Sequence, residues 1–414
     1  MTKLTSIWKP RYFDIGLNVT DSMFLGKYYG SSSLTPKHGS HIQSVTERAV
    51  LFNVKNMLIT SSSIEDSKKH LLLCDDKHYH TTVGVHPCSV AQEFYIQKEI
   101  QPTEEDEDQC RYTDDLISGY QSKLSELSEI AHEGYSKGYI KAYGEIGLDY
   151  DRLHYSSKVQ QIAMFKAQLN LFDSLGLDLP YFLHMRAACD DFIDIIKPYV
   201  EKGLRGVVHS FTGTEDELNK LLSLGFMVGI NGCSLRTDEN IEVASKIPIS
   251  KLMIETDAPY CEIRKNNPAG KKYLTNYPNK FYPQFDEKIQ QELDELKQAV
   301  ETYTAQDTRP KKQRNGGITF STHLPLPIVK SSNVQPYDEI AQSLIKDNST
   351  SIFRSPDGPF YAPIISSRNE PVFVGQIAQI MSSLHGLQED KEIEDFVDTV
   401  YKNTCDFFKI DQIE

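Results

Sequence analysis

The sequence predicts an α/β fold, a parallel (β/α)₈ barrel of the TIM type, on two observations. Eight short β-rich runs recur along the chain, and helix-forming segments lie between several of them. Polar residues stand where many of the runs end. In a barrel of this type, residues at the carboxyl ends of the strands line the active-site mouth.

The eight predicted strands are YFDIGLN (12–18), NMLITSS (56–62), TTVGVHP (81–87), IKAYGEIGLDY (140–150), PYFLHMR (180–186), GVVHSFTG (206–213), FMVGING (226–232) and KLMIETDAP (251–259). Between the fourth and fifth, residues 158–176 carry apolar side chains every three or four positions and end at a glycine, which predicts an amphipathic helix.

Two insertions interrupt this repeat in what we expect to be a single domain, 1–414. Residues 98–123 include PTEEDEDQC and predict a solvated acidic loop. Residues 263–366 follow the eighth strand and are rich in Pro, Asn, Lys and Tyr. Within them, 285–303 predicts one amphipathic helix that packs on the barrel or on a partner. Residues 367–414 predict two closing helices.

Composition sets limits on the function. The 414 residues are 39% hydrophobic and 25% charged, and no run approaches the roughly 18 apolar residues of a membrane helix. The first residues lack the apolar core of a secretory signal, and seven scattered cysteines favour a reducing compartment. We therefore expect a monomeric protein in the cytoplasm, with the nucleus as a second location.

The net charge of −14 argues against a long surface that grips nucleic acid. It leaves room for an enzyme that contacts a few phosphates through a bound metal.

A charge inside an apolar strand identifies the candidate site. Glu145 stands in the middle of KAYGEIGLDYD, and an isolated carboxylate in an apolar interior costs several kcal/mol unless it is paired or bound. His184, His209 and Asp257 occupy corresponding strand ends. A glutamate, two histidines and an aspartate form a ligand set suited to Mg²⁺, Mn²⁺ or Zn²⁺.

Seven motifs occur in an order that resembles the TatD family of metal-dependent deoxyribonucleases: FDIGLNVT, GVHP, YGEIGLDY, FLHMR, VVHSFTGT, IETDAPY and SRNEP. The resemblance covers about residues 11–262 and 366–412. It implies a barrel of the metal-dependent hydrolase superfamily and hydrolysis of DNA phosphodiester bonds, as a 3′–5′ exonuclease with endonuclease activity in addition, in DNA degradation or repair. The expected partner is DNA that is single-stranded or has free ends.

The resemblance also implies roles for individual residues. Glu145, His184, His209 and Asp257 match the metal-binding positions, and His86 matches a histidine that acts near the scissile phosphate. The expected cofactor is a divalent metal, Mg²⁺ first, with Mn²⁺ or Zn²⁺ as alternatives. We expect Glu145 and Asp257 to serve catalysis as well, Asp257 also as a base.

Arg186 is a further catalytic candidate. It lies two residues beyond His184, so the strand period of two points both side chains the same way, and its guanidinium can hold a phosphate oxygen.

One departure concerns the first strand. The wider superfamily commonly carries D-x-H-x-H there, whereas DIGLN places Gly16 and Asn18 at the histidine positions, a variant also found in the TatD branch. Asp14 either orients this strand or packs at the barrel floor. Glu255 either supports the metal ligands or belongs to the barrel core.

The long insertion is mildly basic, with 14 basic and 11 acidic residues in 263–366. Two hypotheses stay open for it: a surface excursion, or a platform offering charge and stacking to single-stranded DNA. The platform would use Lys271, Lys272, Lys311, Lys312 and Arg314 with Tyr273, Tyr277, Phe281 and Tyr282.

Two other functions stay open for the whole chain. One is hydrolysis of a small amide, lactone or phosphoester on the same barrel, since a fold does not fix a substrate. The other is a non-catalytic scaffold, which would have no need to keep metal ligands.

Overall fold

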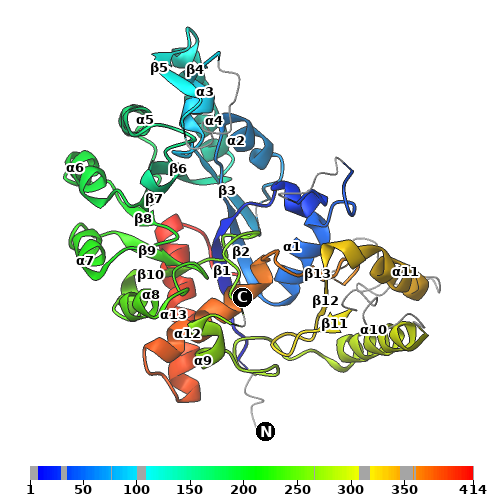
Figure 1. Cartoon of the computed structure of the whole chain (residues 1–414). Coiled ribbons are helices and arrows are strands. Elements are labelled where there is room, and N and C mark those ends of the chain that lie inside the picture. The colour runs from blue at the N-terminus through cyan, green and yellow to red at the C-terminus, as the bar shows by residue number, and fades with distance from the viewer. Residues whose placement is uncertain are drawn as a thin grey trace. The chain divides into compact units, whose positions relative to one another are not determined.

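The computed structural model describes residues 8–28, 35–75, 77–99, 109–264, 266–306, 318–345, 358 and 360–413 (Figure 1). The chain divides into two compact units. We call residues 13–17, 56–255 and 399–414 the barrel unit. Residues 1–12, 18–55 and 256–398 form the second unit, here called the insertion unit.

The eight predicted strands are confirmed and form one sheet in the order β1-β2-β3-β6-β7-β8-β9-β10, a nearly closed barrel (Figure 1). Neighbouring strands run parallel from β2 to β10. Their bounds are β1 Tyr12–Leu17, β2 Val54–Ile59, β3 Tyr79–Val83, β6 Ile140–Asp149, β7 Tyr181–Arg186, β8 Gly206–Val208, β9 Met227–Ile230 and β10 Leu252–Ile254.

Helices alternate with these strands, and local capping signals set several of their ends. Helix α5 (Lys158–Leu175) begins at a capping box between Ser157 and Gln160 and ends at Gly176 in the left-handed region. The other helices of the barrel unit are α2 Ile64–Leu71, α3 Val90–Phe94, α4 Tyr120–Ser136, α6 Cys189–Val200, α7 Glu215–Ser223 and α8 Asp238–Ala244.

A closing helix contributes to the barrel core. Helix α13 (Asp390–Phe408) places Tyr401, Cys405 and Phe408 in one buried cluster with side chains from seven barrel strands. The Tyr401 hydroxyl also donates to Asn56 Oδ1 at 2.9 Å, at the start of β2. The predicted closing helices are thus present, as α13 and α12 (Val374–Leu384).

The flanks of the predicted acidic loop are more ordered than its charge suggested. β4 (Tyr95–Gln97) and β5 (Tyr112–Leu116) pair antiparallel as a separate two-stranded sheet. The acidic residues 100–108 lie outside the described part of the chain.

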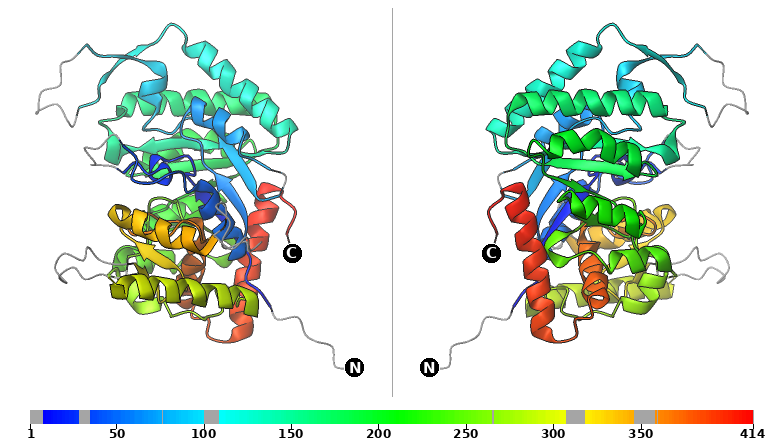
Figure 2. Two further views of the ribbon diagram at one scale, coloured as in Figure 1. Left: turned by 90° about the vertical axis from the view of Figure 1, so that its right-hand side faces the viewer. Right: turned by 90° about the vertical axis from the view of Figure 1, so that its left-hand side faces the viewer.

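The long insertion has secondary structure of its own. It contains α9 (Pro268–Tyr273), α10 (Glu287–Gln306), α11 (Val334–Ile345) and a small sheet of β11 (Thr319–Phe320), β12 (Pro327–Val329) and β13 (Ile364–Ile365). Helix α1 (Ile42–Leu51) and the closing helix α12 also belong to the insertion unit. Helix α10 matches the helix predicted over 285–303, and it lies beside α11 (Figure 2).

Part of the proposed stacking platform is buried. Phe281 and Tyr282 are only 6% and 3% exposed, so neither ring is available to a DNA base. The Phe281 carbonyl accepts a hydrogen bond from the Tyr12 hydroxyl at 2.7 Å, and the Tyr282 ring packs edge-on against Phe52. Lys271, Lys272, Tyr273 and Tyr277 remain at least partly exposed, whereas Lys311, Lys312 and Arg314 lie outside the described residues.

None of the helices described here is long and apolar enough to cross a membrane.

Candidate metal centre

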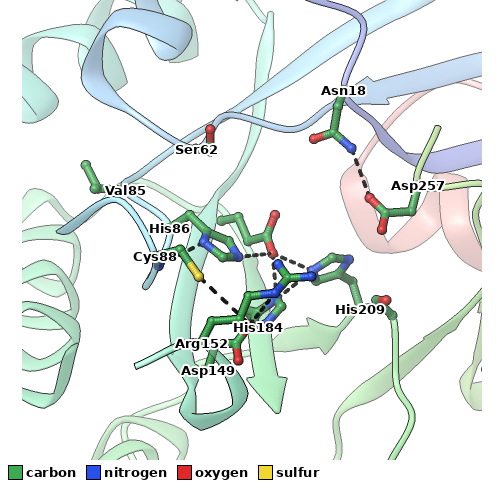
Figure 3. A network of polar contacts seen from close by, with 12 residues as sticks. Asn18, Ser62, Val85, His86, Cys88, Asp149, Arg152, His184, His209 and Asp257 are labelled. Atoms are coloured by element: carbon green, nitrogen blue, oxygen red, sulfur yellow. Dashed lines mark hydrogen bonds and ion pairs between the residues drawn. The ribbon is translucent and has the colours of Figure 1, made fainter. Parts of the chain in front are cut away.

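The buried carboxylate of Glu145 is surrounded by three histidines, His86, His184 and His209, which are labelled in Figure 3. Its Oε1 atom lies 2.6 Å from Nε2 of His209, 2.7 Å from Nδ1 of His184 and 3.2 Å from Nε2 of His86. Glu145 is 6% exposed, and His184 and His209 are also buried. The barrel therefore brings together four of the residues that the sequence singled out.

Strand topology explains why these residues meet. Glu145 lies on β6 and His184 on its neighbour β7, whereas His209 directly follows β8 and His86 follows β3 by three residues. Parallel neighbours present their carboxyl ends on the same side, so side chains far apart in the sequence converge at the barrel mouth.

His86, Glu145 and His184 form a group that could hold a metal ion, with ligand atoms within 4.8 Å of one another, but the contacts of His86 favour a hydrogen-bond donor at Nε2. The backbone N–H of Cys88 donates to Nδ1 of His86 at 3.0 Å. A neutral imidazole that accepts at Nδ1 carries its proton on Nε2, the nitrogen that faces Glu145. We therefore take Glu145 Oε1, His184 Nδ1 and His209 Nε2 as the candidate metal donors of the barrel unit.

The electrostatics of the cluster fit a cation. Burial alone would raise the pKa of Glu145, but His209, His86 and the hydrogen bond from His184 outweigh burial and hold it well below its usual value. Burial likewise opposes charge on His209, yet Glu145 and Glu255 raise the pKa of its ring well above the usual value. A divalent metal can take the place of such ring protons beside an ionised carboxylate.

Asp149 and Arg152, which were not predicted from the sequence, complete the surroundings of the cluster. Asp149 is fully buried at the end of β6, and its Oδ2 lies 3.1 Å from Nε2 of His184. Burial raises the pKa of Asp149, but His184, Arg152 and Arg186 together lower it. The side chain of Arg152 is 47% exposed, and its Nε lies 3.8 Å from Asp149 Oδ2. Asp149 lies four residues after Glu145 in the same run, a spacing of two strand periods that was a usable signal.

The structure shows the contacts of Asp14 and Glu255, for which the sequence left two roles open. Asp14 is buried and accepts a hydrogen bond from the backbone N–H of Gly16 at 3.2 Å, so it orients the first strand locally. Glu255 is buried and faces the ring of His209. Arg186 is half-buried on β7, in register with Asp149 on β6; its phosphate-binding role stays a prediction.

Asp257 follows β10 and belongs to the insertion unit. Its Oδ1 accepts a hydrogen bond from the side-chain amide of Asn18 at 2.9 Å, and its φ of +54° lies in the left-handed region. Asn18, the residue at a superfamily histidine position, thus orients this carboxylate. The place of Asp257 in the ligand set stays a prediction.

The SRNEP motif supports the Asp257 segment. The side chain of Asn369 donates to the Thr256 carbonyl, and its backbone N–H donates to the Pro259 carbonyl, both at 2.9 Å. On either side, Arg368 and Glu370 are fully buried and joined by an ion pair of 2.8 Å. The motif therefore fixes the backbone on both sides of Asp257.

The barrel and its buried Glu/His cluster define the class as (β/α)₈ hydrolases with a candidate metal centre. Within that class, the chain belongs to the TatD family, because the family model described as TatD related DNase matches residues 14–309. The chain is 40% identical over 266 residues to a protein of Schizosaccharomyces pombe named Deoxyribonuclease Tat-D, covering 64% of this chain and 77% of the relative.

Two further similarities extend across species. The chain is 31% identical over 261 residues to a 3′-5′ ssDNA/RNA exonuclease TatD of Yersinia pseudotuberculosis, covering 62% of this chain and 82% of that protein. A crystal structure of an uncharacterized amidohydrolase from Saccharomyces cerevisiae superimposes with a TM-score of 0.67 at 29% identity, covering 96% of this chain and 99% of that one.

Proposed function

We propose that this chain is a metal-dependent deoxyribonuclease that removes nucleotides from the 3′ ends of single-stranded DNA. The observation that carries the proposal is the convergence of Glu145, His184 and His209 donor atoms at the barrel mouth of a TatD-family chain. The names of the relatives support DNA as the substrate, and that of the Yersinia protein supports the 3′–5′ direction. Roles in DNA degradation or repair belong to the same proposal.

The metal is proposed to be divalent. Two imidazole nitrogens and one carboxylate oxygen are a borderline donor set, which on ligand softness favours Mn²⁺ or Zn²⁺ over the Mg²⁺ expected from the sequence. Asp257 would add a second carboxylate and shift the balance toward harder ions. The three metals therefore need to be compared directly.

The side chains have distinct proposed tasks. A bound metal would supply an activated water and neutralise charge on the phosphoryl group. Glu145 stays ionised, while the Nε2–H of His86 donates to a phosphate oxygen. The half-exposed guanidinium of Arg152, with Arg186, holds a second oxygen and fixes the phosphate for attack.

The direct test uses metal-stripped full-length protein and single-stranded DNA labelled at one end. With Mg²⁺, Mn²⁺ or Zn²⁺ added back, a 5′ label should appear on a ladder of shortening products, and a 3′ label should be released at once as a mononucleotide. A chelator should abolish both. The reverse pattern of labels would overturn the polarity, and no cleavage with any of the three metals would overturn the nuclease.

A circular single strand tests the additional endonuclease activity, because a circle has no ends. Linearisation of the circle supports internal cleavage, and an intact circle beside a degraded linear strand limits the enzyme to ends. Incubation with a small amide, a small lactone and a small phosphoester in parallel tests hydrolysis of small molecules. A metal-loaded protein that hydrolyses none of these substrates would favour the scaffold.

The remaining proposals concern the state of the protein in the cell. We propose a monomer in the cytoplasm and nucleus. Light scattering of the purified chain and fractionation of cells are the corresponding measurements.

A further inference from the structure

Each of the two candidate histidine ligands has a buried carboxylate behind it. His184 points Nδ1 at Glu145 Oε1 and Nε2 at Asp149 Oδ2, at 2.7 and 3.1 Å. His209 does the opposite: Nε2 lies 2.6 Å from Glu145 Oε1, and Nδ1 faces Glu255 Oε2 at 3.5 Å. Asp149 and Glu255 are both 0% exposed. The two rings thus present opposite nitrogens to the same carboxylate.

The distance of 3.5 Å between His209 Nδ1 and Glu255 Oε2 is long for a hydrogen bond, but each atom has the other as its available partner. Among the described residues, Nδ1 of His209 and Oε2 of Glu255 are buried and lack any other hydrogen-bond partner. The second oxygen of Glu255 accepts from the Ser210 backbone N–H at 2.6 Å and from the Asn231 side chain at 3.1 Å. Because burying an unpaired polar atom is unfavourable, a slight closing movement that pairs the two atoms lowers the free energy.

Gly16 leaves the space that Glu255 uses. A Cβ atom at Gly16 would lie 2.7 Å from Oε2 of Glu255, too close for both atoms to stay in place. The absence of a side chain at this position, where the wider superfamily commonly carries a histidine, therefore lets Oε2 reach the ring of His209.

From this geometry we infer that Asp149 and Glu255 are positioning residues that select which nitrogen of each histidine is free to bind metal. Asp149 keeps the proton of His184 on Nε2, and Glu255 keeps the proton of His209 on Nδ1. The lone pairs of His184 Nδ1 and His209 Nε2 are then directed toward Glu145. The inference rests on the proposed metal centre, and it matches the general use of carboxylates behind metal-binding histidines.

An amide cannot replace either carboxylate fully. Asp149 Oδ1 accepts from the Asp151 backbone N–H at 3.0 Å while Oδ2 faces His184, so both oxygens serve as acceptors. Glu255 also uses both oxygens. Asn or Gln offers only one acceptor oxygen. Its NH₂ group is a donor and would lie against one of the N–H donors that the carboxylate accepts from.

The experiment reads the ring nitrogens directly. Full-length protein with ¹⁵N-labelled histidine is loaded with Zn²⁺, which is diamagnetic, and long-range ¹H–¹⁵N correlation spectra identify the bound and the protonated nitrogen of each ring. The expected result is zinc on Nδ1 and a proton on Nε2 for His184, and the reverse for His209. Single substitutions of the two histidines assign the signals.

Variants then test the role of the carboxylates. In Asp149→Asn and Glu255→Gln, Zn²⁺ affinity measured by competition with a chelator should fall about 10- to 100-fold. The signals of the affected ring should also lose their single tautomer. Asp191→Asn is the matched control, because Asp191 lies on α6 beside Tyr150 and Lys158 and contacts neither histidine. Parental tautomers and parental Zn²⁺ affinity in both variants would overturn the inference.

Gly16→Ala covers the case in which the charge variants fail to fold. It displaces Oε2 of Glu255 without removing a buried charge, so His209 should change while His184 keeps its signals. An undisturbed His209 with parental Zn²⁺ affinity would contradict the role of Glu255. A parent protein that shows the expected tautomers but cleaves no DNA would overturn the nuclease proposal and leave this inference standing.

Discussion

The backbone N–H of Cys88 lies 3.0 Å from Nδ1 of His86 and donates a hydrogen bond to it. This contact places the proton of the neutral ring on Nε2 and makes His86 a donor toward the barrel mouth. His86→Phe keeps a ring but removes that donor, so kcat for single-stranded DNA should fall about a hundredfold. Zn²⁺ affinity should stay within the error of the parent value.

His86→Gln is the matched variant, because its amide restores an N–H donor and should recover part of the lost kcat. If His86 were instead a metal ligand, both variants would lose metal affinity. Chelator competition beside single-turnover cleavage separates the two roles.

The exposed lysines of α9 give the second prediction. Lys271→Ala with Lys272→Ala should weaken binding of single-stranded DNA and lower the slope of log affinity against log salt by about 1. Lys288→Ala with Lys297→Ala on α10 makes the same change in charge within the same insertion. Equal losses in the two double variants would show that only total charge matters, and no loss in either would leave the insertion without a role in DNA binding.

The third prediction concerns the support of Asp257. Asn369→Ala removes the hydrogen bond to the buried Thr256 carbonyl and should lower the free energy of unfolding by about 1–3 kcal/mol. DNA cleavage at saturating metal should fall as well, since the backbone around Asp257 loosens. Asn170→Ala removes an exposed side-chain hydrogen bond to Tyr199 and serves as the control. Full activity and parental stability in Asn369→Ala would argue against the support.

The fourth prediction is a pH effect away from the candidate site. His80, on β3, is buried, and its ring nitrogens have no hydrogen-bond partner among the described residues; burial and the nearby Lys141 lower its pKa to about 4. The unfolded chain, with the ordinary histidine pKa near 6.5, binds this proton more readily. The neutral, buried ring therefore makes its full contribution to the free energy of unfolding above pH 6.5. About 3 kcal/mol of that free energy is lost as the pH falls from 6.5 to about 4.

His80→Gln removes this titration, so urea midpoints of the variant should vary less between pH 6.5 and 4 than those of the parent. His132→Gln, at an exposed position on α4, should leave the dependence unchanged. Parallel pH curves for His80→Gln and the parent would show that His80 does not carry the effect.

The strands and the central cluster could be predicted because they depend on local signals. Short apolar runs predicted the strands of the barrel, and the polar residues within or after these runs identified Glu145, His184, His209 and His86. Asp149 gave a weaker signal. Its spacing of four from Glu145 indicates a shared face in a regular strand, but β6 shifts register against β7 between Tyr143 and Ile146 and has glycines with positive φ at 144 and 147. Such irregularity hides which residues share a face.

Burial within the insertion could not be predicted for a different reason. Phe281 and Tyr282 stand in a segment rich in Pro, Asn and Lys, which is typical of a surface loop. Their partners Tyr12 and Phe52 are more than two hundred residues away in the sequence, so no local pattern reports the contact.

In the proposed function, the charge of Glu145 serves to hold a metal for cleavage. Glu145→Gln keeps the shape of the side chain and removes the charge, and Glu133→Gln, on the exposed side of α4, is the control. The most direct measurement compares, for each protein, the rise in Tm on adding Mn²⁺ or Zn²⁺ with the rate of cleavage of end-labelled single-stranded DNA. A metal that binds only the folded state raises Tm, and loss of the metal that activates water should cost at least about a hundredfold in rate. We predict that Glu145→Gln loses most of the metal-induced rise and at least that factor in rate, while Glu133→Gln keeps both. Cleavage at the parental rate by Glu145→Gln, with an unchanged metal-induced rise in Tm, would show that the charge of Glu145 does not hold a catalytic metal.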